Sequence, residues 1–234
     1  MSPTATTTRV VLERRYNGPP ETANGGYACG VVASHVDGPA HVSLRRPVPL
    51  GTPLELERHD DGHVTLHDGE MLIAEADPAL PLDELVPPYR PSLEEAHEAA
   101  ARRPATWPAA FDRCWVCSPR EDGLGVLFGP LPSRPGMTGA VLHAGAGGAL
   151  APEVVWAALD CPSYTPSLWE SDVPSLLASM RAELLEPVPS GEPVAVVGWT
   201  LGSEGRKHRS ATAILARDGR VLARAEALWI RLRG

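Results

Sequence analysis

Hydrophobic and polar positions alternate in short segments along much of the chain, and turns rich in proline and glycine separate these segments. Residues 46–54 (RPVPLGTPL) and 186–194 (EPVPSGEPV) share Pro-Val-Pro-x-Gly-x-Pro at an offset of 140 positions. Alternating segments flank the motif in both copies. Each copy therefore predicts two strands joined by a turn, and the repetition predicts a duplicated module.

A second repeated feature is an Asp-Gly turn. Residues 66–72 (LHDGEML) and 216–222 (ARDGRVL) share Asp-Gly and a following Leu, between apolar runs. This pattern predicts a tight hairpin whose glycine takes a positive φ. Because the offset has grown to 150 positions, we expect an insertion in the second copy. Its simplest place is a polar loop over residues 201–210 (LGSEGRKHRS), since loops tolerate insertions at little cost.

One helix is predicted upstream of each strand block, over residues 21–35 in the first half and 151–163 in the second. Each half is thus expected to contain a strand, a helix and then four strands. The second helix is apolar on every side from Val154 to Leu159 and then carries a carboxylate at Asp160. An unpaired charge in a dry core would be costly, so Asp160 needs an explanation.

The final segment, residues 220–232, has the clearest strand pattern of the chain. Alternate apolar positions predict one buried face, which Arg224 and Glu226 interrupt near the middle. Such interruptions are typical of a strand near the edge of a sheet. The apolar positions of this face are Leu222, Leu228, Ile230 and Leu232.

The two halves are joined by a proline-rich stretch, residues 77–108, with one predicted helix over 92–103. Ser92 is its expected N-cap, and Glu95 completes a capping box. We expect this helix to pack on the sheet as ordinary structure. The predicted organisation is an N-terminal module over residues 1–80, a connector over 81–111 and a C-terminal module over 112–234.

Composition and charge exclude several function classes. The net charge is −8, and no basic run exceeds two residues, so no nucleic-acid partner is expected. No segment approaches the roughly 18 apolar residues that span a bilayer, and the N-terminus lacks the apolar core of a secretion signal. Four cysteines without dense spacing are typical of a reducing compartment. We therefore predict a cytoplasmic protein with no membrane partner.

An apolar helix wrapped by an antiparallel sheet, repeated in tandem, resembles the hotdog fold of acyl-CoA thioesterases and thioester dehydratases. The implied fold class is α+β, a double hotdog. Residues 24–33 (NGGYACGVVA) and 151–160 (APEVVWAALD) are similar to the family pattern of HGG, six residues and an acid. Residues 114–124 (CWVCSPREDGL) are similar to the family's CFxCGxxNxxGL opening.

The resemblance implies that each site combines the helix N-terminus of one module with the acid of the other. The Gly-Gly pair occurs only in the first copy, at Gly25 and Gly26, and the acid only in the second, at Asp160. One composite site is therefore expected, and the other, at Pro152 and Ala33, is expected to be degenerate. Glycine N–H groups at a helix N-terminus suit a developing oxyanion, and Asp160 suits a base or nucleophile.

The implied activity is hydrolysis of acyl-CoA or acyl-carrier thioesters, with the thioester as substrate and no cofactor. Asn24 and Tyr27, beside the glycines, are candidate substrate-binding residues. Because the chain contains no glutamine to help position water, Thr200 is the candidate for that role. Arg206 and Lys207 could bind the phosphates of coenzyme A, although a solvated loop is the alternative interpretation. Association of the chain with copies of itself, as a homo-oligomer, also stays open.

Several alternatives stay open at this point. Asp160 could instead cap the turn that follows its helix. Cys114-x-x-Cys117 has half the spacing of a zinc site, but no second pair follows, so no metal site is expected. Cys29, Cys161, His97 and His143 are scattered in the sequence. The rival function is a non-catalytic acyl-binding or scaffold protein, and a dehydratase, which would need a histidine base, comes third.

Overall fold

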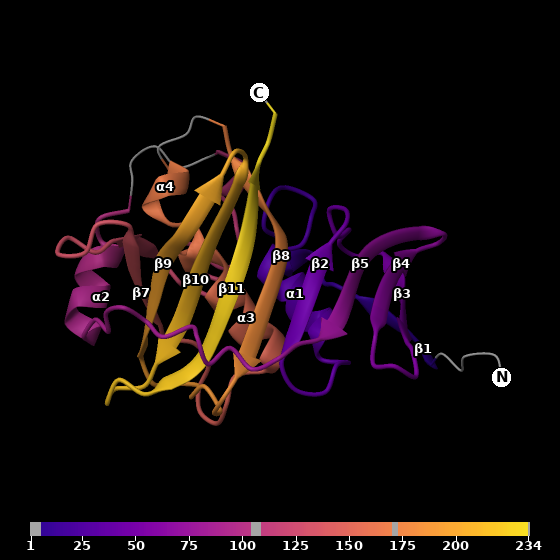
Figure 1. The fold of residues 1–234 in the computed structure, drawn as a ribbon, viewed down its shortest axis with the longest axis horizontal. Coiled ribbons are helices and arrows are strands. Elements are labelled where there is room, and N and C mark those ends of the chain that lie inside the picture. The colour runs from indigo at the N-terminus through magenta and orange to yellow at the C-terminus, as the bar shows by residue number, and fades with distance from the viewer. Residues whose placement is uncertain (1–5, 104–108, 170–172, 234) are drawn as a thin grey trace.

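A computed structural model describes residues 6–103, 109–169 and 173–233. In these residues one antiparallel sheet of 11 strands curves around two helices, α1 and α3 (Figure 1). The strands follow the order β1-β3-β4-β5-β2-β8-β11-β10-β9-β7-β6. None of the described helices is long and apolar enough to cross a membrane.

The first half contains a strand, a helix and four further strands, as the sequence predicted. α1 is shorter than the 21–35 segment because Asn24 caps its start and the chain turns after residue 33. The elements are β1 (Thr6–Val11), α1 (Gly25–Ala33), β2 (Ala40–Leu44), β3 (Pro53–Arg58), β4 (Val64–Asp68) and β5 (Met71–Pro78).

The second half repeats this plan with one extra short strand at its start. Strands β7, β9, β10, β11 and β8 occupy the places that β1, β3, β4, β5 and β2 take in the first half. The elements are β6 (Phe128–Pro130), β7 (Met137–Leu142), α3 (Pro152–Asp160), α4 (Pro166–Trp169), β8 (Ser175–Leu184), β9 (Val194–Glu204), β10 (Lys207–Leu215) and β11 (Val221–Arg231).

The two halves join through β2 and β8, which pair antiparallel from Ala40↔Ala182 to Ser43↔Ser179. Both Asp-Gly turns form as predicted, with φ of +58° at Gly69 and +83° at Gly219. The duplication seen in the sequence is therefore a duplication of topology, with one continuous sheet in place of two separate ones.

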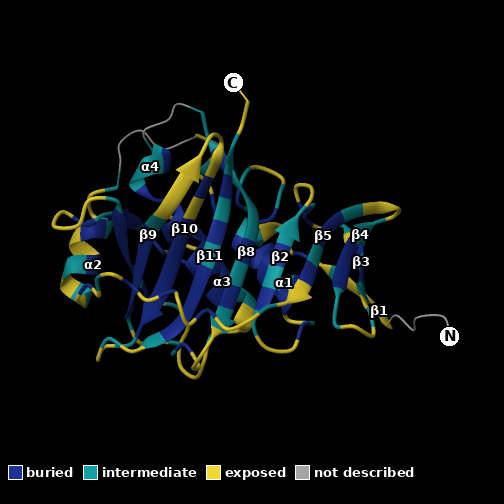
Figure 2. Cartoon of the chain, in the orientation of Figure 1, coloured by how far each residue is buried: buried dark blue, intermediate teal, exposed yellow. Residues whose placement is uncertain are grey.

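The sequence predicted that the insertion in the second copy is a polar loop over residues 201–210, and this prediction was wrong. The insertion lengthens β9 to 11 residues and β10 to 9, against 6 and 5 in β3 and β4. Only Gly205 and Arg206 form the turn between them. The far end of this hairpin is exposed in Figure 2. A polar extended hairpin and a polar loop have similar compositions, which is why the sequence did not separate them.

The prediction for β11 was wrong in two respects. β11 lies between β8 and β10, near the middle of the sheet rather than at its edge. Leu222 is buried, as predicted, but the rest of the buried face consists of the small residues Ala223, Ala225 and Ala227 together with Trp229, because the helices lie close to the sheet there. Arg224 and Glu226 therefore lie on the outer face with Leu228.

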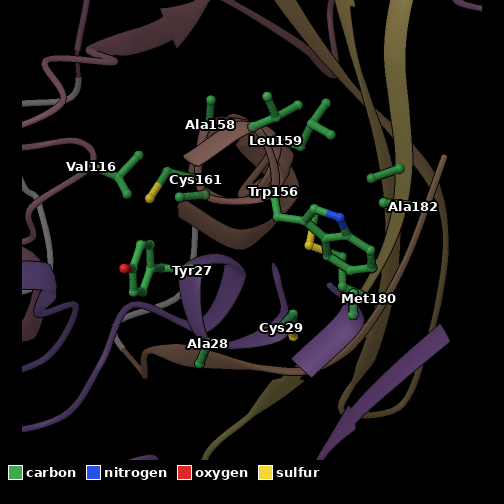
Figure 3. Packing of buried hydrophobic residues seen from close by; sticks show 14 of the residues in the cluster. Tyr27, Ala28, Cys29, Val116, Trp156, Ala158, Leu159, Cys161, Met180 and Ala182 are labelled. Carbon is green, nitrogen blue, oxygen red and sulfur yellow. The ribbon is translucent and has the colours of Figure 1, made fainter. Parts of the chain in front are cut away.

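The core fills the space between the sheet and the α1–α3 pair. Figure 3 shows the ring of Trp156, on α3, lying against Met180 and Ala182 of β8. All three residues are at most 4% exposed. The two helices run antiparallel, so that Gly26 meets Asp160 and Gly30 meets Glu153.

The connector helix α2 (Leu93–Ala100) forms with the predicted capping box between Ser92 and Glu95. Its Ala96 and Ala99 pack against a second apolar cluster that includes Met137 and Val197, so it covers the sheet as expected. Residues 104–108 of the predicted connector lie outside the described residues. The proposed module limits at 80 and 112 stay predictions.

Candidate active site between the two halves

The N-terminus of α1 holds the carboxylate of Asp160 from the other half of the chain. The backbone N–H of Gly26 donates to Asp160 Oδ2 at 2.9 Å. The side-chain amide of Asn24 donates to the same oxygen at 3.0 Å. Asn24 Oδ1 accepts from the N–H of Tyr27 at 2.9 Å, so one residue caps α1 and orients Asp160.

Glycine at position 26 is required by the closeness of the two helices. A Cβ at Gly26 would lie 2.4 Å from the Cβ of Asp160 and 2.7 Å from the carbonyl oxygen of Trp156. At Gly25 the nearest atom would be Cδ2 of Leu177, the end of a flexible side chain, at 2.9 Å. The N–H of Gly25 has no hydrogen-bond partner in the described part of the chain.

Hydroxyl groups hold the end of α3 in place behind Asp160. Thr212 Oγ1 donates to the carbonyl of Leu159 at 2.7 Å, and Ser163 Oγ donates to that of Asp160 at 2.6 Å. The indole N–H of Trp229 donates in turn to Ser163 Oγ at 2.9 Å. The carboxylate itself makes no capping bond to the turn after α3, so the capping interpretation of Asp160 was wrong.

Asp160 is 2% exposed, and burial raises the pKa of its carboxyl to about 7. The hydrogen bonds from Gly26 and Asn24 oppose this increase in pKa, and the electrostatic interaction with Cys114 adds to it. Asp160 Oδ1 has no hydrogen-bond partner among the described residues. The site therefore holds a carboxyl group with one oxygen fixed and one available.

A cavity of about 480 Å³ lies beside this carboxylate and is lined by both halves of the chain. Its polar end contains Asn24, Gly25 and Asp160, and much of the remaining wall is apolar. The exposed side chains of Arg45 and Arg46 also line it. The apolar wall includes Leu44, Val48, Leu176, Leu177 and Trp229.

Three cysteines meet at the wall of the same cavity. The sulfur atoms of Cys114, Cys117 and Cys161 lie within 4.8 Å of one another, and all three residues are buried. Cys161 follows α3 directly and comes from far along the chain, so the expectation that it is scattered from the Cys114-x-x-Cys117 pair was wrong. The fold, and not the local spacing, brings it there.

Two of the predicted site residues lie away from the cavity. The ring of Tyr27 stacks on Tyr16 at 4.0 Å between centroids and meets Trp115 edge-on at 5.7 Å, in an aromatic cluster outside the cavity lining. Thr200 contacts Thr165, with 2.9 Å between their hydroxyl oxygens, and Ser167. The structure brings neither residue to Asp160.

The predicted phosphate-binding residues Arg206 and Lys207 do not line the cavity but lie next to its lining. They are at the end of the β9–β10 hairpin and line a surface hollow with Glu204 and Ile230. Lys207 pairs with Ile230, which also lines the cavity. Arg45 and Arg46, which line the cavity, were not predicted from the sequence. The available signal was their position directly before the repeated proline motif.

The opposite end of the helix pair lacks both functional groups. Ala33 stands where an acid would be needed, and Pro152 has no N–H to donate. The sequence predicted this asymmetry, and the antiparallel arrangement of α1 and α3 places these two helix ends on the same side.

Comparison with known proteins supports the fold independently. No protein-family model matches the chain, and no curated protein matches it. Solved structures do match. A hotdog-fold protein of unknown function from Alicyclobacillus acidocaldarius is 12% identical, with a TM-score of 0.63 over 100% of this chain and 95% of the other.

Two further solved structures are described as thioesterases. A protein provisionally described as a thioesterase, from Novosphingobium aromaticivorans, is 14% identical, with a TM-score of 0.66 over 97% of this chain and 96% of the other. Acyl-CoA thioesterase II TesB2 from Mycobacterium marinum is 14% identical, with a TM-score of 0.57 over 97% and 93%. At this identity the likeness establishes the fold, which is the double hotdog predicted from the sequence.

Proposed function

We propose that this double hotdog protein hydrolyses acyl thioesters at the composite site formed by Gly25, Gly26 and Asp160. The observation that carries the proposal is the state of the Asp160 carboxylate. Its Oδ2 is held by the N-terminus of α1, and its Oδ1 has no partner among the described residues. It lies beside a cavity large enough for a small acyl group.

In the proposed reaction Asp160 acts as the base. Oδ1 accepts a proton from a water molecule, whose oxygen attacks the thioester carbonyl carbon. The negative charge that develops on the carbonyl oxygen is stabilised by the N–H of Gly25 and the dipole of α1. The carbon–sulfur bond then breaks, and the departing thiolate takes the proton back from Asp160.

Gly25 and Gly26 have different roles in this proposal. The N–H of Gly26 is already used by Asp160, so it fixes the base. The N–H of Gly25 has no partner in the described chain, and Gly25 lines the cavity. Gly25 is therefore the proposed oxyanion donor, and Asn24 is a positioning residue that holds Asp160.

The substrate proposed here is an acyl-CoA. The apolar wall of the cavity suits an acyl chain, and Arg45 and Arg46 suit the phosphates of coenzyme A. Arg45 already contacts Glu75, with Nε donating at 3.0 Å. Arg46 has no ion pair in the described part of the chain, so it is the stronger candidate for phosphate binding.

A non-catalytic acyl-binding protein is the second candidate. The observation in its favour is the absence of glutamine from the whole sequence, which removes a side chain that could position water. A dehydratase is less well supported because none of the described residues that line the cavity is a histidine.

The test compares thiol release from a panel of acyl-CoAs by the wild type, Asp160→Asn and Glu153→Gln. Glu153 lies on the same helix at its opposite end, so it is the matched control. We expect Asp160→Asn to lower kcat by about 100-fold or more and Glu153→Gln to leave it unchanged. Equal rates in the wild type and Asp160→Asn would refute the catalytic role.

A second arm tests the phosphate contact. Arg46→Ala should raise KM for acyl-CoA and leave KM unchanged for the matching acyl-pantetheine, which lacks the nucleotide phosphates. If the wild type releases no thiol but acyl-CoA raises its melting temperature, the acyl-binding alternative is correct.

A further inference from the structure

We infer that Cys114, Cys117 and Cys161 form a binding site for a soft divalent metal ion, Zn²⁺, whose fourth coordination position faces the cavity. A tetrahedral zinc ion with Zn–S bonds of about 2.3 Å holds its sulfur ligands about 3.8 Å apart. In this protein the sulfur atoms of Cys114 and Cys161 are 3.9 Å apart. All three sulfur atoms lie within 4.8 Å of one another.

The local chain positions the first two ligands. Cys114 and Cys117 belong to a tight loop in which the N–H of Ser118 donates to the carbonyl of Cys114 at 3.1 Å. The loop is tied further by the N–H of Val126, which donates to the carbonyl of Val116 at 2.8 Å. A Cys-x-x-Cys turn of this kind is one half of many structural zinc sites.

The third ligand comes from the end of α3. Figure 3 shows the sulfur of Cys161 pointing away from that helix, on the side where Val116 lies. The Thr212 and Ser163 bonds that fix the last carbonyls of α3 also fix the start of the next turn, where Cys161 is. The three ligand positions are therefore set by bonds that do not involve the sulfur atoms.

N–H groups of the protein point at the sulfur atoms. The amide of Asn24 donates to the sulfur of Cys114 at 3.8 Å and to that of Cys161 at 3.7 Å. The backbone of Val116 and Cys117 also hydrogen-bonds the sulfur of Cys114. Such donors suit thiolate ligands, and a metal ion would supply the positive charge that three thiolates need. Thiolate ligands select Zn²⁺ or Cu⁺ over Mg²⁺ and Ca²⁺.

The cavity provides both access and the open coordination position. Cys114, Cys117 and Cys161 all line it, so an ion can reach the sulfur atoms without unfolding the core. Three protein ligands and one position open to a cavity are typical of zinc sites that bind a small molecule. This inference is independent of the proposed hydrolysis, since it concerns the cysteines alone.

The test uses Co²⁺ as a spectroscopic substitute for Zn²⁺ in the full chain, prepared metal-free in a reducing buffer. We expect one equivalent of Co²⁺ to give a thiolate-to-cobalt charge-transfer band that Zn²⁺ then abolishes. Cys29→Ser is the matched control, because Cys29 is the fourth cysteine and lies outside the group. It should keep the full band, and Cys114→Ser, Cys117→Ser and Cys161→Ser should each weaken or lose it.

Asp160→Asn separates this site from the proposed catalytic one. It should keep the cobalt band whether or not it lowers hydrolysis. A wild type without a thiolate band, or a band of equal strength in the three cysteine variants, would overturn the inference.

A second measurement uses only the wild type, so its result does not depend on whether the cysteine variants fold. Zn²⁺, but not Mg²⁺, should slow alkylation of Cys114, Cys117 and Cys161 as followed by peptide mass spectrometry. Alkylation of these three cysteines at the same rate with either ion would equally count against the site.

Discussion

The backbone N–H of Gly26 and the carboxylate of Asp160 are joined by a hydrogen bond of 2.9 Å across 134 positions of sequence. This contact ties the first half of the chain to the second at the place where their helices cross. It exists because glycine lets the backbone of α1 approach the last turn of α3.

We expect Gly26→Ala to lower the free energy of unfolding by about 1 to 3 kcal/mol. Alanine would favour the helix by about 1 kcal/mol through propensity, but the added methyl would lie 2.4 Å from Asp160 Cβ and 2.7 Å from the carbonyl oxygen of Trp156. Neither atom is the end of a flexible side chain, so the clash outweighs propensity. Urea denaturation followed by circular dichroism measures the difference.

Gly25→Ala is the matched control for this substitution. Its methyl would lie 2.9 Å from Cδ2 of Leu177, which can rotate away, and 3.1 Å from Cβ of the same residue, which needs a shift of only a few tenths of an ångström. We expect a change within about 1 kcal/mol. Equal destabilisation of the two variants would show that the contact between α1 and α3 is less close than described.

Thr212→Val should lower the free energy of unfolding by about 1 to 3 kcal/mol. The substitution keeps the shape but removes the hydroxyl that donates to the carbonyl of Leu159 at 2.7 Å. That buried carbonyl at the end of α3 then loses its partner. Thermal or urea unfolding gives the magnitude, and thiol release would fall as well if the end of α3 positions Asp160.

The matched control is Thr65→Val in the first half of the chain. Thr65 Oγ1 is buried and has no hydrogen-bond partner among the described residues. Removing this hydroxyl should leave stability unchanged or raise it, because no bond is lost and an unsatisfied polar atom is removed. A similar loss of stability in both variants would mean that the Thr212 bond contributes nothing specific.

The composite site could be predicted because its parts are complementary in the sequence. The first helix starts with Gly25-Gly26 but has Ala33 where an acid would stand, and the second helix has Asp160 but starts with Pro152-Glu153 in place of the glycines. An internal repeat shows which positions correspond, so the unequal residues stand out. The meeting of Gly26 and Asp160 in space could then be inferred from the family resemblance.

Other parts of the site needed the fold. Cys161 joins Cys114 and Cys117 only because the chain between them returns to the same place, and no local spacing signals that return. The buried face of β11 was missed for a different reason. Alanine ranks low in hydrophobicity, yet Ala223, Ala225 and Ala227 face the helices because only small side chains fit there.

Arg224→Ala should lower the free energy of unfolding by about 2 to 4 kcal/mol. The Arg224 side chain is 9% exposed and lies 2.7 Å from Glu183, whose side chain is 12% exposed. Removing the guanidinium leaves the carboxylate of Glu183 nearly buried without its partner charge. Urea denaturation near neutral pH measures the loss.

Arg224 also contacts Asp83, at 2.7 Å, which links the connector to the outer face of the sheet. The Asp83 side chain is 88% exposed, so Asp83→Ala should cost less than about 1 kcal/mol. If Asp83→Ala were as destabilising as Arg224→Ala, the connector contact and not the Glu183 pair would be the important one.

His208 should contribute a loss of stability as the pH decreases below about 6.5. Asp160, whose pKa is raised to about 7, contributes in the opposite direction over the same range, so the His208 contribution is read from the difference between the wild type and a His208 variant. Burial lowers the pKa of His208 from its usual value of 6.5, and the positive charge of Arg231 lowers it further. Its Nδ1 lies 2.8 Å from Ser203 Oγ, and its Nε2 is buried without a partner among the described residues. The unfolded chain therefore binds a proton at His208 more readily than the folded chain does. Below the unfolded pKa this difference favours unfolding, and above it the contribution of His208 is constant.

The measurement is the free energy of unfolding in urea at several pH values between about 7.5 and 5.5. Uptake of one proton by the unfolded chain changes this free energy by at most about 1.4 kcal/mol per pH unit. As the pH decreases, the stability of the wild type should fall relative to that of His208→Gln, because the variant has no imidazole to titrate there. His97→Gln, on an exposed position of α2, is the control for losing an imidazole as such. A pH dependence that is the same in the wild type and His208→Gln would show that His208 binds protons equally well in the folded and unfolded chains.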